Sequence, residues 1–352
     1  MKIKKLIISL ISVFLLFTMC ACASKSEETT EMTQSDSLEK GDLTVIGFSQ
    51  LGAESDWRSA NTQSMKSTFT EENGYRLIFE DGQQKQANQI MAIRKFIQQE
   101  VDYIVLAPVT ETGWDTVLME AKDAGIPVII VDRMVDVKDD SLYECWVGSD
   151  FKLEGMKMCQ WLNDYCKKKG IRGSDLRIVD LQGNIGATAQ IGRTKGLSES
   201  ARKFGWKVLE YVPADFTQTK GREVMKILLK KYKDINVVYC ENDNEALGAI
   251  EAIEEAGKKA GPNIRAGEIM VLSFDGINEN ARQYVIDNKI SCIAECNPLH
   301  GPRVKGIIEK LEKGQEPPKL SYVDEDIYAH DAFIENIRVD SIEYPITVLS
   351  TK

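Results

Sequence analysis

The stretch Thr44-Val-Ile-Gly-Phe-Ser-Gln-Leu-Gly-Ala-Glu-Ser-Asp-Trp-Arg58 decides the fold class. Its first part, residues 44–48, is β-branched and aromatic, which predicts a buried strand. A polar loop over residues 49–56 follows, and its Gly52 lets the backbone turn. Trp57 then opens a pattern of residues at helical spacing. The order of strand, loop and helix predicts a βα unit, in which ligands bind beyond the carboxyl end of the strand.

The same unit recurs along the chain, as short apolar runs that alternate with segments of helical periodicity. The expected strands cover residues 44–48, 76–80, 103–107, 127–131, 143–148, 176–181, 206–211, 236–240, 270–274 and 290–294. Strands that alternate with helices of ten to fifteen residues pair in parallel, with right-handed crossovers. The sequence therefore predicts an α/β protein with doubly wound parallel sheets.

The units fall into two similar series, which favours two lobes over one long sheet, and 352 residues also suggest two domains. We expect the chain to cross between the lobes near Gly148, near Glu295 and between residues 322 and 327. The first lobe is then formed by residues 43–148 plus 296–325, and the second by residues 149–295 plus 326–352. For the tail from His330 onward we expect only that it covers the second lobe.

The first 22 residues have the pattern of a targeting segment. Three lysines are followed by an apolar run over residues 6–19, which is too short to span a bilayer comfortably. The run ends in Met-Cys-Ala-Cys-Ala-Ser, which resembles the lipobox of bacterial lipoproteins. Because Ala21 precedes it, Cys22 is the preferred lipidation site and Cys20 the second choice; an ordinary cleaved signal is the alternative.

Residues 23–42 are rich in Ser, Thr, Glu and Lys without apolar periodicity, which predicts a flexible tether. The protein is therefore expected outside the cytoplasm, anchored to the outer face of the cell membrane through lipid at its N-terminus.

Charge and residue usage exclude several classes of function. A net charge of −10 disfavours nucleic acid, whose binding depends on Lys and Arg. Six cysteines follow the signal, but with two histidines and no Cys-x-x-Cys motif we expect neither a zinc site nor any other metal. Phosphate-loop, dinucleotide-binding and His-Glu-x-x-His motifs are absent from the sequence, and we expect no cofactor and no enzyme. A glycosidase that uses Glu54 with Asp132 or Asp275 is the alternative left open.

Polar side chains gather where the predicted strands end. Carboxylates accept hydrogen bonds and guanidinium groups donate several in a fixed geometry, so together they can hold the neighbouring hydroxyls of a sugar. Trp57 offers an apolar ring face for the same ligand. The candidate ligand-binding residues are Glu54, Ser55, Asp56, Trp57, Arg58, Asp132, Arg133, Arg193, Asn242, Asp275 and Glu295.

A family resemblance covers residues 43–323. It rests on Glu54-Ser-Asp-Trp-Arg58, Asp81-Gly-Gln-Gln-Lys-Gln86, Ala107-Pro108, Asp132-Arg133, Asn242-Asp243 and Ser273-Phe-Asp-Gly276. This set resembles periplasmic sugar-binding proteins of the ribose-binding type, and most of all the galactofuranose-binding proteins of ABC transporters. Two positions depart from the family pattern: Asp56 stands where the galactofuranose binders have Gly, and Glu295 where ribose binders have Gln.

The resemblance implies two Rossmann-like lobes, joined by three hinge strands, that close on a monosaccharide. The implied partners are the sugar, with galactofuranose first and related furanoses, pentoses or hexoses next, and an ABC transporter permease. We expect a monomer. Two alternatives stay open: a sugar-sensing receptor that feeds a membrane kinase or chemoreceptor, and a surface carbohydrate-active enzyme.

Overall fold

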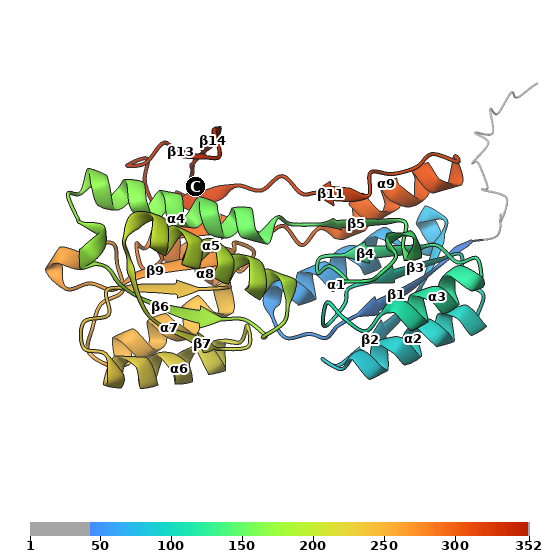
Figure 1. Cartoon of the computed structure of the whole chain (residues 1–352), viewed down its shortest axis with the longest axis horizontal. Helices are drawn as coiled ribbons and strands as arrows, with labels where there is room; N and C mark the ends of the chain where they lie inside the picture. The colour runs from blue at the N-terminus through green and yellow to red at the C-terminus, as the bar shows by residue number, and fades with distance from the viewer. Residues whose placement is uncertain (1–42, 351–352) are drawn as a thin grey trace, which may run out of the picture. The chain divides into compact units, whose positions relative to one another are not determined.

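A computed structural model describes residues 43–350 of the chain. The predicted signal segment, the lipidation site Cys22 and the tether at residues 23–42 lie outside the described residues. The described part contains two large sheets, one of six strands and one of seven. We call the elements packed on the six-stranded sheet the first lobe and those packed on the seven-stranded sheet the second lobe (Figure 1).

The six-stranded sheet has the order β11-β5-β4-β3-β1-β2, and its paired strands are all parallel. The elements of the first lobe are β1 (Thr44–Gln50), α1 (Asp56–Thr68), β2 (Tyr75–Asp81), α2 (Gln86–Gln98), β3 (Tyr103–Leu106), α3 (Asp115–Asp123), β4 (Val128–Val131), β5 (Cys145–Gly148), α9 (His300–Glu312) and β11 (Leu320–Tyr322). Strands β3 and β4 are almost continuously apolar because helices cover both faces of the sheet.

The seven-stranded sheet has the order β15-β12-β10-β9-β8-β6-β7. The elements of the second lobe are α4 (Phe151–Lys168), β6 (Arg177–Gln182), α5 (Thr188–Phe204), β7 (Lys207–Pro213), α6 (Gln218–Lys231), β8 (Val237–Cys240), α7 (Asp243–Glu255), β9 (Met270–Asp275), α8 (Glu279–Ile286), β10 (Cys292–Glu295), β12 (Ile327–Ala329), β13 (Asn336–Val339), β14 (Ile342–Pro345) and β15 (Thr347–Val348).

Helices lie on both faces of each sheet, so each lobe has two layers of core. In the first lobe, α1 and α9 pack on one face, and α2 and α3 on the other. In the second lobe, α4 and α5 cover one face, while α6, α7 and α8 cover the opposite one. The prediction of doubly wound α/β lobes is confirmed.

One strand pair differs from the expected parallel arrangement, since β12 runs antiparallel to β10. The chain reaches β12 directly from β11 of the first lobe, through four residues. Ile327, the first residue of β12, pairs with Ala294 near the carboxyl end of β10. Strand β12 therefore enters the sheet at the edge where β10 ends, and runs the opposite way.

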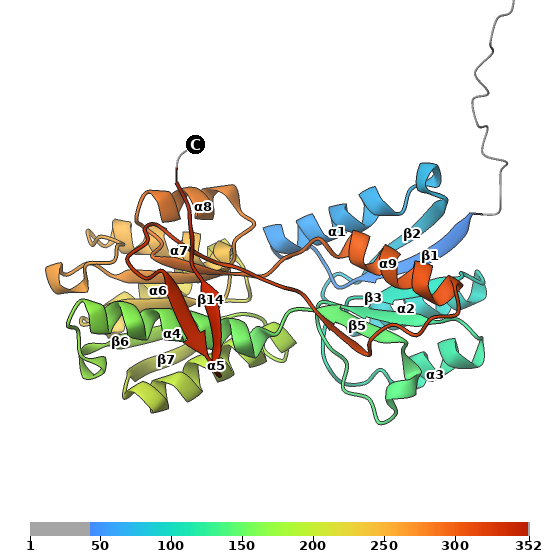
Figure 2. The same cartoon turned by 90° about the horizontal axis from the view of Figure 1, so that it is seen from above.

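The chain passes between the lobes three times (Figure 2). These crossovers lie between β5 and α4, between β10 and α9, and between β11 and β12. Residues 336–345 form a hairpin against α4, and β15 adds to the edge of the second sheet beside β12. The apolar residues Ile337 and Val339 of the hairpin join the core next to α4, so the tail covers part of this lobe.

The six cysteines in the described residues are buried, and each is a free thiol. None of the helices within residues 43–350 has both the length and the apolar character needed to cross a membrane.

Candidate ligand-binding site

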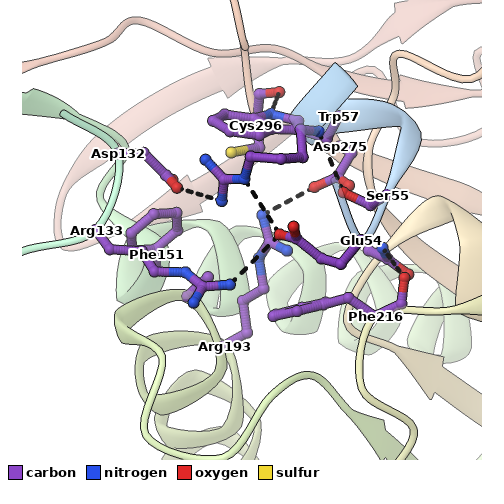
Figure 3. A pocket seen from close by; sticks show the side chains of 13 residues that line it. Glu54, Ser55, Trp57, Asp132, Arg133, Phe151, Arg193, Phe216, Asp275 and Cys296 are labelled. Atoms are coloured by element: carbon purple, nitrogen blue, oxygen red, sulfur yellow. Dashed lines mark hydrogen bonds and ion pairs between the residues drawn. The ribbon is translucent and has the colours of Figure 1, made fainter. Parts of the chain in front are cut away.

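A pocket lies between the carboxyl ends of the strands of the two lobes (Figure 3). It contains about 310 Å³ of space outside protein atoms, counting the part open to solvent. Its lining comes from both lobes and consists of Glu54, Ser55, Trp57, Arg58, Asp132, Arg133, Phe151, Ala189, Arg193, Phe216, Asn242, Asp275 and Cys296.

The loop after β1 places Trp57 and Arg58 in the pocket. Ser55 is the N-cap of α1, and its hydroxyl accepts a hydrogen bond from the Arg58 backbone N–H at 3.2 Å. This cap starts the helix at a position that turns both large side chains inward. The Trp57 indole N–H donates to the Cys296 carbonyl at 2.7 Å, which joins α1 to the second crossover.

Arg58 lies between two carboxylates of its own lobe. Its Nη2 is 2.6 Å from Asp132 and its Nε is 3.1 Å from Glu54. Burial by itself would lower the pKa of Arg58, but the charges of the two carboxylates outweigh that effect. The pKa of Arg58 is therefore above its ordinary value. Its Nη1 is buried and has no hydrogen-bond partner in the described residues, so one donor is free for a ligand.

Asp132 and Arg133 follow the buried strand β4. Asp132 has a φ of 62°, a left-handed conformation that non-glycine residues seldom adopt, and its carbonyl accepts from the Trp146 indole at 3.0 Å. Arg133 donates to the Val109 carbonyl at 3.0 Å and lies 3.6 Å from Glu54. Burial, together with the charge of Arg58, lowers the pKa of Arg133 to about 10, which leaves it protonated at neutral pH.

The second lobe contributes a matching ion-pair cluster around Arg193 of α5. Its guanidinium is 2.8 Å from Glu154 and 3.2 Å from Asp275, and it also donates to the Glu241 carbonyl. Asp275 ends β9 with a φ of 89°. Burial raises the pKa of Asp275 well above its ordinary value, although the charge of Arg193 opposes the increase.

Asn242 lies at the pocket as the N-cap of α7. Its Oδ1 accepts from the Glu245 N–H at 2.8 Å, and its Nδ2 donates to the Phe216 carbonyl at 3.0 Å. The second bond holds Phe216 at the pocket, where its φ is 59°. The Asn242 amide therefore positions both a helix and an aromatic ring.

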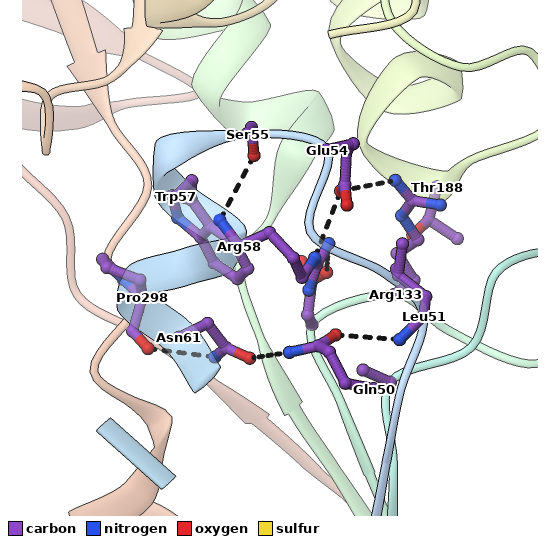
Figure 4. A network of polar contacts seen from close by, with 12 residues as sticks. Gln50, Leu51, Glu54, Ser55, Trp57, Arg58, Asn61, Arg133, Thr188 and Pro298 are labelled. Atoms are coloured by element: carbon purple, nitrogen blue, oxygen red, sulfur yellow. Dashed lines mark hydrogen bonds and ion pairs between the residues drawn. The ribbon is translucent and has the colours of Figure 1, made fainter. Parts of the chain in front are cut away.

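A relay of buried amides behind the pocket was not predicted (Figure 4). The Gln50 Nε2 donates to Asn61 Oδ1 at 3.0 Å, and the Asn61 Nδ2 donates to the Pro298 carbonyl at 3.0 Å. The relay fixes the end of β1 against α1 and the second crossover. Its sequence signal is weak, because a polar residue at a strand end or on a helix is ordinarily exposed.

Four lining residues are also missing from the sequence prediction: Phe151, Ala189, Phe216 and Cys296. Phe216 follows the end of β7, so the strand-end rule that identified Asp132 would have found it too. Phe151 is the first residue of α4, and its place beside the pocket depends on the crossover that precedes it. No sequence pattern distinguishes Cys296 from the other buried cysteines.

Nine of the predicted binding residues line the pocket, and two do not. Asp56 bonds with Asn244 and Asn278 of the second lobe, because the first residue of α1 faces away from the pocket. Glu295 accepts from the Asp326 N–H at 2.9 Å, at the crossover between β11 and β12.

Charges in the lining balance. Counted by formal charge, Arg58, Arg133 and Arg193 supply three positive charges, and Glu54, Asp132 and Asp275 supply three negative ones. Such a pocket suits a neutral polar ligand, because an anion or a cation would leave a buried charge without a partner.

One further cluster in the described residues has the composition of a cation site. Glu154, Cys296 and Glu325 each place one ligand atom within 4.8 Å of the others. Arg193 already pairs with Glu154 at 2.8 Å, and its positive charge opposes a cation there, so we assign no metal to this cluster.

The family description "Periplasmic binding protein domain" matches residues 46–300, most of the chain. The chain belongs to this family. It is 40% identical over 298 residues to the galactofuranose-binding protein YtfQ of Escherichia coli K12, which covers 83% of this chain and 90% of that protein.

Solved structures of the family agree with this membership. One is a Mycobacterium smegmatis protein in complex with β-D-fucofuranose, with a TM-score of 0.75, 41% identity and coverage of 81% of this chain and 91% of that one. Another is the binding protein of the arabinose ABC transporter of Shewanella sp. ANA-3, bound to L-arabinofuranose, with a TM-score of 0.75, 40% identity and coverage of 81% and 91%. The resemblance seen in the sequence is therefore confirmed.

Proposed function

We propose that this periplasmic binding protein captures one neutral monosaccharide, in the furanose form, between its two lobes and delivers it to an ABC transporter permease. The observation that carries the proposal is the charge-balanced pocket, in which three arginines and three carboxylates from both lobes converge. Sugar hydroxyls both donate and accept, so each can bridge a carboxylate and a guanidinium in such a lining.

The lining offers enough polar groups for useful affinity. Each neutral hydrogen bond contributes about 0.5–1.5 kcal/mol net, and bonds to charged groups contribute more. About six such bonds give micromolar binding, or about −8 kcal/mol, after the cost of ordering the ligand. Trp57, Phe151 and Phe216 add apolar ring surface for the C–H faces of the sugar. The proposed contacts come from Glu54, Ser55, Trp57, Arg58, Asp132, Arg133, Phe151, Arg193, Phe216, Asn242 and Asp275.

The relatives support a furanose ring. The Escherichia coli protein is named for galactofuranose, and the two solved structures contain fucofuranose and arabinofuranose. We therefore place galactofuranose first among ligands for this chain and arabinofuranose second. Bound sugar would favour the closed arrangement of the lobes, since its contacts come from both.

The same proposal includes an anchor. Cys22 carries lipid at the N-terminus, and residues 23–42 tether the binding lobes to the outer face of the membrane, near the permease. Labelling of the expressed protein with a radioactive or alkyne-tagged fatty acid tests this arrangement. Label is expected on the native chain and absent from Cys22→Ser; label that persists in that variant contradicts the assignment to Cys22.

A thermal-shift screen against free sugars, followed by calorimetry, tests the ligand. A ligand well above its dissociation constant raises the melting temperature by mass action, and we expect this for galactofuranose or arabinofuranose at one-to-one stoichiometry. Arg133→Ala and Asp275→Ala should each weaken binding by about tenfold or more, because each removes a charged hydrogen-bonding partner. Arg94→Ala, in an exposed ion pair, is the control that keeps native affinity. Unchanged affinity in both pocket variants contradicts the site.

A further inference from the structure

Asp56 makes hydrogen bonds across the two lobes without entering the pocket. Its backbone N–H donates to Asn244 Oδ1 at 3.2 Å, and its carboxylate accepts from Asn244 Nδ2 at 3.1 Å. The Asn278 amide donates to the same carboxylate oxygen. Asp56 belongs to α1 of the first lobe, whereas Asn244 and Asn278 belong to α7 and the start of α8 in the second. One short side chain therefore joins the lobes through two amides.

We propose that Asp56, Asn244 and Asn278 form a latch that stabilises the closed arrangement of the lobes and slows release of the bound ligand. The inference rests on the proposed function in one respect, that the lobes close on the ligand. Asp56 then acts as a positioning residue, through the equilibrium between open and closed forms. None of the three residues lies in a crossover, so rotation about the crossovers separates them.

The side-chain amides of Asn244 and Asn278 form few other hydrogen bonds in the described residues. Asn278 Oδ1 caps α8 by accepting from the Ala281 N–H at 3.1 Å, which leaves its Nδ2 for Asp56. In the described residues, the Asn244 side chain forms two hydrogen bonds, one through Oδ1 and one through Nδ2, and both are with Asp56. Asn244 thus has a cross-lobe role that is separable from helix capping.

Electrostatics favour an acidic residue at this point. Asp56 is the first residue of α1, Asn244 lies in the first turn of α7, and Asn278 caps α8. The N-terminal end of each helix carries a partial positive charge, which favours a nearby carboxylate.

Another cross-lobe hydrogen bond in the described residues lies outside the crossovers and differs in kind. The Met134 N–H donates to the Thr188 hydroxyl at 3.3 Å, on the side of the pocket formed by β4 and α5. It is a single hydrogen bond between two neutral groups, a backbone N–H and a side-chain hydroxyl. The latch has more bonds and a charged acceptor, so we expect it to contribute more to closed-state stability than this single bond.

The test compares Asp56→Ala, Asn244→Ala and the double variant. Stopped-flow fluorescence of the pocket tryptophan gives the rate at which bound galactofuranose or arabinofuranose dissociates. Each single variant loses two partly exposed hydrogen bonds, which should accelerate dissociation about three- to tenfold. The two changes share one hydrogen bond, from Asn244 Nδ2 to Asp56, so the acceleration in the double variant should be smaller than the product of the two single effects.

Small-angle scattering of the ligand-free protein provides a second readout that requires no sugar. The native protein should populate closed conformers, and Asp56→Ala and Asn244→Ala should increase the radius of gyration. Asp115→Ala is the matched control: it also removes an acidic first residue of a helix, α3, but one without a cross-lobe bond, and it should leave both readouts unchanged.

The outcomes separate the latch from the proposed function. If the native protein binds no sugar, the proposed function fails, and the scattering comparison still decides whether the latch exists. If the native protein binds sugar but the latch variants match it in both dissociation rate and radius of gyration, the latch is overturned and the proposed function stands.

Discussion

At the scale of single residues, the candidate site depends on carboxylates held in unfavourable backbone conformations. Asp132 and Asp275 end buried strands with positive φ values of 62° and 89°. Such a conformation costs about 1–3 kcal/mol and persists only where surrounding contacts impose it. Here the contacts include Arg58 for Asp132 and Arg193 for Asp275. The carboxylates are therefore fixed toward the pocket before any ligand arrives.

The Arg193 cluster makes a prediction about stability. Arg193→Lys keeps the charge, but an ammonium cannot reach Glu154, Asp275 and the Glu241 carbonyl at once. Buried carboxylates without partners are costly, so we expect a loss of about 2–4 kcal/mol in the free energy of unfolding. Urea denaturation measures it. Arg94→Lys, in an exposed pair with Glu120, is the control and should change stability by less than about 0.5 kcal/mol. Equal losses in the free energy of unfolding in the two variants would contradict a larger contribution from the buried cluster.

At the scale of elements, two helices of the second lobe approach closely because of glycine. A Cβ added to Gly248 of α7 would lie 2.1 Å from the Gln218 carbonyl oxygen at the start of α6. Backbone atoms cannot move as a flexible side chain can. Gly221 of α6 faces α7 in a similar way, with Glu245 Cα 2.9 Å from its hypothetical Cβ. The helix pair is thus set by two small residues.

A matched pair of glycine substitutions tests this packing. Gly248→Ala should separate α6 from α7 and lower the free energy of unfolding by about 1–3 kcal/mol, as overpacking does. At Gly306 in α9, no atom lies within 4 Å of an added Cβ. Gly306→Ala should therefore raise the free energy of unfolding by about 0.5–1 kcal/mol, because alanine favours a helix. Chemical denaturation of both variants measures the effects. A stabilised Gly248→Ala protein would contradict the close approach.

At the scale of the whole molecule, buried carboxyl groups link stability to pH. Burial raises the pKa of Glu241 to about 8, of Asp243 to about 7 and of Glu325 to about 9. The folded protein therefore keeps protons at neutral pH that the unfolded chain, with ordinary carboxyl pKa values near 4.5, has released. Where the folded state binds more protons, its stability falls as pH rises.

This linkage predicts a higher melting temperature at pH 6.5 than at pH 8.5, measured by calorimetry without ligand. Glu241→Gln cannot ionise and should reduce the difference, whereas Glu120→Gln, at an exposed position, should leave it unchanged. Below about pH 6.5 the trend should weaken. Burial lowers the pKa of His300 to about 4, so the unfolded chain then gains a proton that the folded one does not. A melting temperature that rises from pH 6.5 to 8.5 would contradict the assignment.

Most of the fold could be predicted from the sequence because its signals are local. The run at residues 270–274 predicts a strand, and β9 covers Met270–Asp275. Strand β12 could not be predicted in the same way, since its direction depends on where the chain enters the second sheet after leaving the first.

Of the site, the sequence by itself determined the polar side chains at strand ends, because parallel strands bring their carboxyl ends to one edge. Tertiary structure alone decided which of them face the pocket. Asp56 and Trp57 are neighbours in the chain, yet the turn of α1 directs Trp57 into the pocket and Asp56 to the other lobe. Tertiary structure also brought Phe151, the first residue of α4, and Cys296, in the crossover between β10 and α9, to the pocket. Strand ends follow from hydrophobic periodicity, whereas cross-lobe contacts form between residues far apart in sequence, whose proximity no local pattern records.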